Sequence, residues 1–155
     1  MEAKIGLSKK ELTDSVKILT ELLGSEMVLT VKTRNFHWNI KGRSFMEFHK
    51  LLDKQYDLLN ELVDLIAERI SKLGGTAVGI MKDFIDKSEL KETSSAPDQT
   101  KMLSILLEDQ QNVAKTLRDH IEKLGETKDF VTTDFLTGVL EKHEDMIWEI
   151  RSYLS

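Results

Sequence analysis

An apolar seam through residues 45–73 constrains the fold more than any other feature of this sequence. Its members recur at steps near three and four: Phe45, Phe48, Leu52, Leu59, Val63, Ile66, Ile70 and Leu73. This spacing is typical of a helix that buries one stripe against neighbouring helices. Ser44 and Glu47, in "SFME", predict a capping box at the start of this helix, and Gly74-Gly75 predicts its end.

Three further long helices are predicted from caps and periodicity. The first begins at Ser8, where "SKKE" forms a capping box with Glu11, and runs to about Trp38. Its apolar positions at helical spacing are Leu12, Val16, Leu19, Leu23 and Met27. The other two are expected from about residue 98 to 124, ending at Gly125, and from residue 132 or 133 to about 153.

The lengths of the connections predict how these helices are arranged. The connections between the first and second long helices and between the third and fourth are short. We therefore expect the two helices of each pair to pack as antiparallel neighbours. Residues 76–97 form a longer, irregular connection, in which "VGIMKDFI" predicts a short helix. We therefore expect residues 1–155 to be a single all-α domain, a ferritin-like four-helix bundle with a long second-to-third connection that carries a short helix.

Composition excludes several classes of function. A formal net charge of −5 argues against a chain that coats nucleic acid. The sequence contains no cysteine, so a metal would have to bind through His, Asp and Glu. The run "LGGTAVGIM" is too short to span a membrane, and "MEAKIGLSKK" lacks a hydrophobic signal segment. The expected location is the cytoplasm.

Polar residues line one edge of the helix that carries the seam. At about 100° per residue, Asp53, Asp64 and Glu68 fall within about 100° of His49 on the helical wheel. Imidazole nitrogen and carboxylate oxygen are ligands for iron, zinc and manganese. Taken singly, each residue fits a solvated helix face equally well, and His37 fits a packed or capping histidine. Their coincidence in one narrow stripe favours a metal site.

The length of the stripe requires a second chain. His49 and Asp64 are fifteen residues apart, or about 22 Å along a helix, whereas metal ligands lie about 2 Å from the ion. Two copies of this helix, antiparallel about a two-fold axis near Leu58, would bring His49 and Asp53 of one copy to the acids of the other. A di-iron site within one chain is disfavoured, because no histidine follows a Glu by three residues.

The same residues resemble a known family. "NFHWNIKG", "HKLLDKQYDLLNELVDLIAERISKLGG" and the ending "HEDMIWEIRSYL" are similar to the Dps family, the mini-ferritins or DNA-binding proteins from starved cells. The resemblance implies that His37, His49 and Asp53 of one subunit bind metal together with Asp64 and Glu68 of its two-fold mate. It also implies that Trp38 lies beside this site as a sixth catalytic residue; simple packing at the dimer interface is the alternative for Trp38.

Ferroxidase activity in a hollow homododecamer is the function that the resemblance implies. Such a protein oxidises Fe(II), preferably with hydrogen peroxide, stores ferric oxide and limits oxidative damage. Zinc is expected as a competing metal, and one or two irons per site remain open. Acidic residues that draw Fe(II) through pores would be Asp129, Asp134 and Glu141, and Asp57 and Glu61 would nucleate the mineral. For Asp134 the alternative is an acid placed at a helix N-terminus, where the helix dipole favours negative charge. We expect His120 and His143 to be structural, with His120 favoured as a cation near a helix C-terminus.

Two rival functions stay open at this point. One is a nucleoid-associated protein that protects DNA mainly by coating it. Only seven residues precede Ser8, with Lys4 as their single lysine, and "RSYLS" offers no basic tail, so we expect weak or absent DNA binding. The other rival is a structural helical assembly whose stripe is inactive or holds zinc.

Overall fold

The computed structural model describes residues 3–93 and 97–155, and within these ranges the chain is helical without strands. The helices are α1 (Lys9–Asn39), α2 (Phe45–Lys72), α3 (Met81–Lys87), α4 (Gln99–Gly125) and α5 (Phe130–Leu154). The all-α fold and the short helix in the long connection are confirmed. None of the helices in the described ranges is long and apolar enough to cross a membrane.

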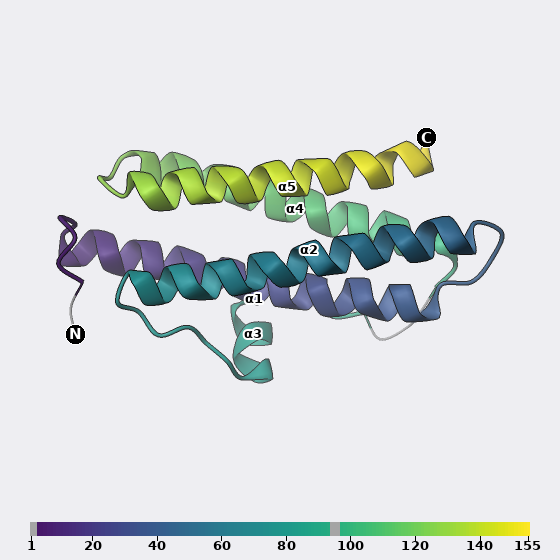
Figure 1. Cartoon of the computed structure of the whole chain (residues 1–155), viewed down its shortest axis with the longest axis horizontal. Coiled ribbons are helices and arrows are strands. Elements are labelled where there is room, and N and C mark those ends of the chain that lie inside the picture. Colours follow the sequence, from purple (N-terminus) through teal and green to yellow (C-terminus); the bar gives the residue numbers. More distant parts are fainter. Residues whose placement is uncertain (1–2, 94–96) are drawn as a thin grey trace.

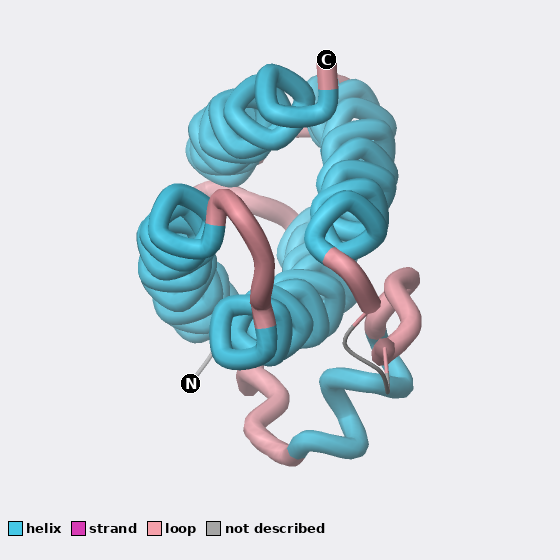
Figure 2. Tube along the Cα trace, turned by 90° about the vertical axis from the view of Figure 1, so that its right-hand side faces the viewer, coloured by secondary structure: helices cyan, strands magenta, loops and turns pink. Residues whose placement is uncertain are grey.

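Four long helices form the bundle, and α3 lies outside it. The helices α1 and α2 pack as one antiparallel pair and α4 and α5 as another (Figure 1). The end-on view in Figure 2 shows the four long helices surrounding a common interior. Because α2 and α4 run in the same direction, the connection between them has to return along the bundle, and residues 73–93 form the described part of this return. This is the predicted ferritin-like connection.

The apolar seam of α2 faces the bundle interior, as expected. Leu52, Leu59, Ile66 and Ile70 are fully buried there. Phe45 departs from the prediction, since its side chain is 39% exposed at the end of the bundle. Val63 is only partly buried, and Leu62, which lies outside the predicted seam, is buried in the core. The core stripe is therefore slightly rotated from the predicted one.

One of the two predicted capping boxes is present. The Glu11 amide donates to Ser8 Oγ at 3.2 Å, and the Ser8 amide donates to Glu11 Oε2 at 2.8 Å. Hydrogen bonds from Ser8 and from the Lys128 backbone lower the pKa of Glu11 to about 2. The capping box predicted at Ser44 is wrong. Ser44 is the N-cap of α2, but its φ of −98° and ψ of 36° lie outside the extended region, and its side chain makes no capping hydrogen bond.

The start of α5 differs from the prediction because Asp129 is its N-cap. The Asp129 carboxylate accepts from the Thr132 amide at 3.1 Å, from Ser15 Oγ at 2.6 Å and from the Arg69 guanidinium at 3.1 Å. Burial raises the pKa of Asp129, but these bonds together hold it below its usual value. Since Asp129 is buried and fully engaged, the expectation that it lines a pore is wrong.

The short helix α3 docks on α1 at a glycine. A Cβ at Gly24 would lie 2.7 Å from the Phe84 carbonyl oxygen and 2.9 Å from the Ser88 amide nitrogen. Only glycine therefore permits this close approach of the two backbones. Phe84 is buried at this contact, which holds the long connection against the middle of α1 (Figure 1).

Candidate metal centre

His37 and His49 are brought face to face by the turn between α1 and α2. His37 lies in the last turn of α1, and His49 lies in the second turn of α2, which runs back alongside it. Their rings are stacked, with centroids 3.9 Å apart and planes inclined by 20°. The two histidines that bracket the turn in the sequence are therefore direct neighbours in the fold.

Reciprocal hydrogen bonds fix the tautomer of both rings. His37 Nδ1 lies 3.0 Å from the His49 carbonyl oxygen, and His49 Nδ1 lies 3.1 Å from the His37 carbonyl oxygen. A carbonyl oxygen only accepts, so each Nδ1 must donate a proton. In the neutral ring this leaves the lone pair on Nε2, which is the form that binds a metal. Both imidazoles are thus prepared as Nε2 ligands before any metal arrives.

Asp53 completes the part of the site that one chain provides. It follows His49 by one helical turn, and its Oδ1 lies 3.9 Å from His37 Nε2. Two ligands that each lie about 2 Å from one ion are separated by roughly 3–4 Å, so this spacing fits a shared metal. The side chain of Asp53 is 52% exposed, whereas that of His37 is 10% exposed. The group is therefore open on its carboxylate side.

Asp64 and Glu68 lie on the same helix but not in this group. Asp64 is exposed, and Glu68 is paired with Lys72 Nζ at 2.9 Å, which lowers the pKa of Glu68. Across residues 3–93 and 97–155, no three His, Asp or Glu side chains are gathered closely enough to hold a metal on their own. One chain thus presents two imidazoles and one acid at one end of α2, and two further acids at the other end.

Trp38 follows the first histidine and points away from the bundle. Its side chain is 71% exposed, and Val31, two turns earlier on α1, is 42% exposed. Leu65, beside Asp64 on α2, is 39% exposed. Exposed large apolar side chains mark a contact surface where they form a contiguous patch. Trp38 is the sequence neighbour of His37, but its ring does not pack against the two stacked imidazoles.

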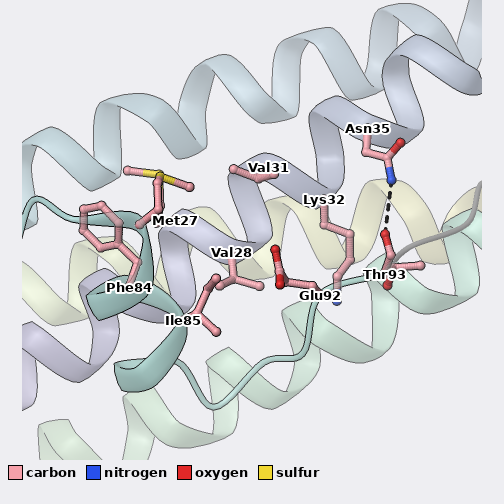
Figure 3. A pocket seen from close by; sticks show the side chains of 10 residues that line it. Met27, Val28, Val31, Lys32, Asn35, Phe84, Ile85, Glu92 and Thr93 are labelled. Carbon is pink, nitrogen blue, oxygen red and sulfur yellow. Dashed lines mark hydrogen bonds between the residues drawn. The ribbon is translucent and has the colours of Figure 1, made fainter.

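An apolar hollow between α1 and α3 lies apart from the histidines. Met27, Val28, Val31, Phe84 and Ile85 form much of its apolar lining (Figure 3). The dashed line in Figure 3 is the bond from Asn35 Nδ2 to the Thr93 carbonyl oxygen, 3.3 Å long. No histidine lines this hollow, so we do not assign the metal chemistry to it.

The other two histidines have different surroundings. His143 is fully buried and bonds to Glu26 and Gln110, as expected for a structural residue. Partial burial lowers the pKa of His120, which opposes the positive charge expected there near the C-terminus of α4. Among the described residues, the buried carboxylates are those of Glu26, which is bonded to His143, and Asp129, the N-cap of α5. That arrangement does not resemble a carboxylate-rich di-iron site.

Comparison with known proteins identifies the family. The model of the ferritin-like domain matches residues 16–155. A DNA protection during starvation protein of Porphyromonas gingivalis is 32% identical over 148 residues, covering 96% of this chain and 93% of that protein. The chain belongs to the Dps family of ferritin-like proteins. The resemblance drawn from the histidine and acid spacing is thereby confirmed.

Two further proteins are similar to this chain over nearly its whole length. An uncharacterized low temperature-induced protein of Nostoc is 37% identical over 152 residues, covering 97% of this chain and 85% of that protein. The crystal structure of a Dps protein from Vibrio cholerae O1 superposes with a TM-score of 0.94 at 26% identity, covering 99% of this chain and 97% of that one. That protein is described as a member of a superfamily of ferritin-like diiron-carboxylate proteins.

Proposed function

We propose that this protein is an iron-oxidising and iron-storing mini-ferritin. Fe(II) is its substrate, hydrogen peroxide its preferred oxidant, and ferric oxide held inside a hollow homododecamer its product. Each site is shared: His37, His49 and Asp53 come from one subunit, and Asp64 and Glu68 come from its two-fold mate. The protein would act in the cytoplasm and limit oxidative damage, as its membership of the Dps family suggests.

The observation that carries this proposal is the stacked histidine pair, in which Nδ1 of each ring is bonded to a backbone carbonyl. These bonds leave Nε2 as the acceptor atom of each ring, able to take a proton or a hydrogen bond or to bind a metal. His37 Nε2 already lies 3.9 Å from Asp53 Oδ1. The remaining two acids lie eleven and fifteen residues beyond Asp53 on α2, roughly 16–22 Å away, which excludes their joining the same ion within one chain. A second subunit removes that obstacle.

The proposed chemistry balances when two irons react with one peroxide. Two Fe(II), one hydrogen peroxide and two protons give two Fe(III) and two water molecules, so the O–O bond breaks without releasing a hydroxyl radical. Asp53, Asp64 and Glu68 would stabilise the higher charge of Fe(III) relative to Fe(II). Zinc, which takes the same ligands, is expected to compete.

Assembly would cover the apolar side chains around the site. Trp38 and Leu65 are exposed in the single chain, and they are the sequence neighbours of His37 and Asp64. A native mass measurement of the particle tests for a dodecamer. Asp134, Glu141, Asp57 and Glu61 are exposed, so they stay available for the proposed pore and nucleation roles.

Removing one ligand from each half of the shared site should abolish peroxide-driven iron oxidation. We expect a His37→Ala, Asp64→Ala double variant to lose at least 100-fold in the rate of Fe(III) formation, because every site then lacks two ligands. The measurement is an anaerobic Fe(II) titration followed by stoichiometric peroxide. A Lys50→Ala variant, altered at an exposed residue beside His49, serves as the control. Wild-type oxidation in the double variant would refute the proposed site.

A second candidate function is protection of DNA by direct binding, which the name of the P. gingivalis relative raises. The net charge of −5 opposes it, since phosphate binding releases counterions only where several basic residues meet the backbone. We therefore expect no shift of duplex DNA in a gel at about 150 mM salt. A shift that persists at this salt would favour the second function.

A further inference from the structure

Both candidate imidazoles lie inside a longer stack of side chains. Phe45 stacks on His49 with centroids 4.9 Å apart and planes inclined by 27°. At the other end, the Tyr56 ring meets His37 edge-on at 5.2 Å and 77°. The Arg34 guanidinium carbon lies 4.9 Å from the centroid of the Tyr56 ring. The order Phe45–His49–His37–Tyr56–Arg34 thus encloses the two rings from both sides.

Helical spacing builds this stack from two helices. Arg34 precedes His37 by three residues on α1, and Phe45 precedes His49 by four on α2, so each pair lies on one helix face. Tyr56 follows Asp53 by three residues and lies on the same face of α2. Because α1 and α2 are antiparallel neighbours, the two sets meet. Phe45 is more exposed than the buried residues of the seam because its ring packs on His49 instead of the bundle core.

Tyr56 lies beside two of the three ligands that one chain offers. Its ring lies against His37, and the Asp53 carboxylate is near enough to its hydroxyl to shift its pKa. Hydrogen bonding to Asp53, together with burial and the charges of Asp53 and Asp57, raises the pKa of Tyr56, while the Arg34 charge opposes the rise. Tyr56 therefore lies between an imidazole ligand and a carboxylate ligand.

We propose that Tyr56, seated on Arg34, is a positioning residue of the metal site and that it clamps the His37–His49 pair against Phe45. The Nδ1 bonds fix how each ring is turned, but an imidazole can still swing about its Cα–Cβ bond. Ring contacts on both outer faces of the pair limit that motion, so less side-chain entropy is lost when metal binds. This inference rests on the proposed function, because it concerns the same site.

Binding of Co(II) to the assembled protein tests the clamp without relying on iron oxidation. We expect Tyr56→Leu, which removes the aromatic edge and the seat of Arg34, to weaken Co(II) binding by about 10–100-fold in calorimetric titrations. Tyr56→Phe keeps the ring, so its Co(II) affinity should stay within about threefold of wild type. The matched control is Tyr153→Leu, the same substitution at the other tyrosine of the chain, on α5.

Each outcome separates the clamp from the site itself. If the wild type binds no Co(II), or if His37→Ala binds it as well as wild type, the proposed metal site is wrong. If His37→Ala abolishes binding while Tyr56→Leu keeps wild-type affinity, the site stands and the clamp is wrong. Equal losses in Tyr56→Phe and Tyr56→Leu would also overturn the clamp, because the hydroxyl rather than the ring would then matter. Native mass and the thermal unfolding midpoint, measured for every variant, must match wild type for its affinity to count.

Discussion

Two inactive variants of this protein should regain about a quarter of the wild-type ferroxidase rate when their subunits are mixed. One variant lacks the imidazoles (His37→Ala, His49→Ala), and the other lacks the distant acids (Asp64→Ala, Glu68→Ala). Alone, neither can form a complete site if each site draws on two chains. In random 1:1 assembly, half of the two-fold pairs are mixed, and each mixed pair has one intact site of its two.

This experiment distinguishes a shared site from a site within one chain. An intrachain site would be broken in every subunit of both variants, so mixing could restore nothing. A matched control pairs the imidazole variant with His37→Ala, Asp64→Ala, a combination in which no pair has all five ligands. Peroxide-driven Fe(III) formation is measured on particles whose mixed composition is established by native mass. Mixed particles without any recovery would contradict the shared site.

The sequence predicts most of the fold because its signals are local. Caps and breakers such as Ser8, Asp98 and Gly125 mark helix ends within the chain itself, and the structure confirms them. The bundle arrangement follows from connection lengths alone. Prediction fails at Ser44 and at the start of α5, where the backbone angles of a turn and the bonding of Asp129 to Ser15 and Arg69 decide the outcome. These depend on contacts between distant segments.

At the candidate site, too, the sequence predicts the features that depend on local spacing and misses those that depend on contacts between helices. Residue type and helical spacing are enough to place His49, Asp53, Asp64 and Glu68 on one stripe of a helix. The reciprocal histidine bonds could not be foreseen, because backbone carbonyls have no residue-specific signal in a sequence. Tyr56 did carry a usable signal, its position three residues after Asp53, but aromatic residues at helical spacing more often belong to a core.

Loss of either partner of the buried Glu26–His143 pair should destabilise the subunit by about 3–5 kcal/mol. His143 Nε2 lies 2.6 Å from Glu26 Oε1, and both side chains are fully buried between α1 and α5. His143 Nδ1 bonds to Gln110 Oε1, and the Gln110 amide nitrogen faces the Met146 sulfur at 3.4 Å. Glu26→Leu or His143→Leu would leave the other polar group buried without its partner.

The double variant Glu26→Leu, His143→Leu should recover most of that loss. Removing both partners removes the need to desolvate a charge, and Glu26 Oε2 has no hydrogen-bond partner among the described residues even in the wild type. Recovery would stop short of complete because Gln110 Oε1 loses its donor. Unfolding in urea at one fixed protein concentration gives the free energies, since assembly makes stability depend on concentration.

An exposed pair provides the control for this comparison. Arg118 and Glu144 form an ion pair whose side chains are both more than half exposed, and Glu144→Ala should change the free energy of unfolding by at most about 1 kcal/mol. If the losses in free energy of unfolding from Glu26→Leu and His143→Leu instead added up in the double variant, the two residues would act independently. The pair would then stabilise the bundle by packing alone, and the bond between its two members would contribute nothing of its own.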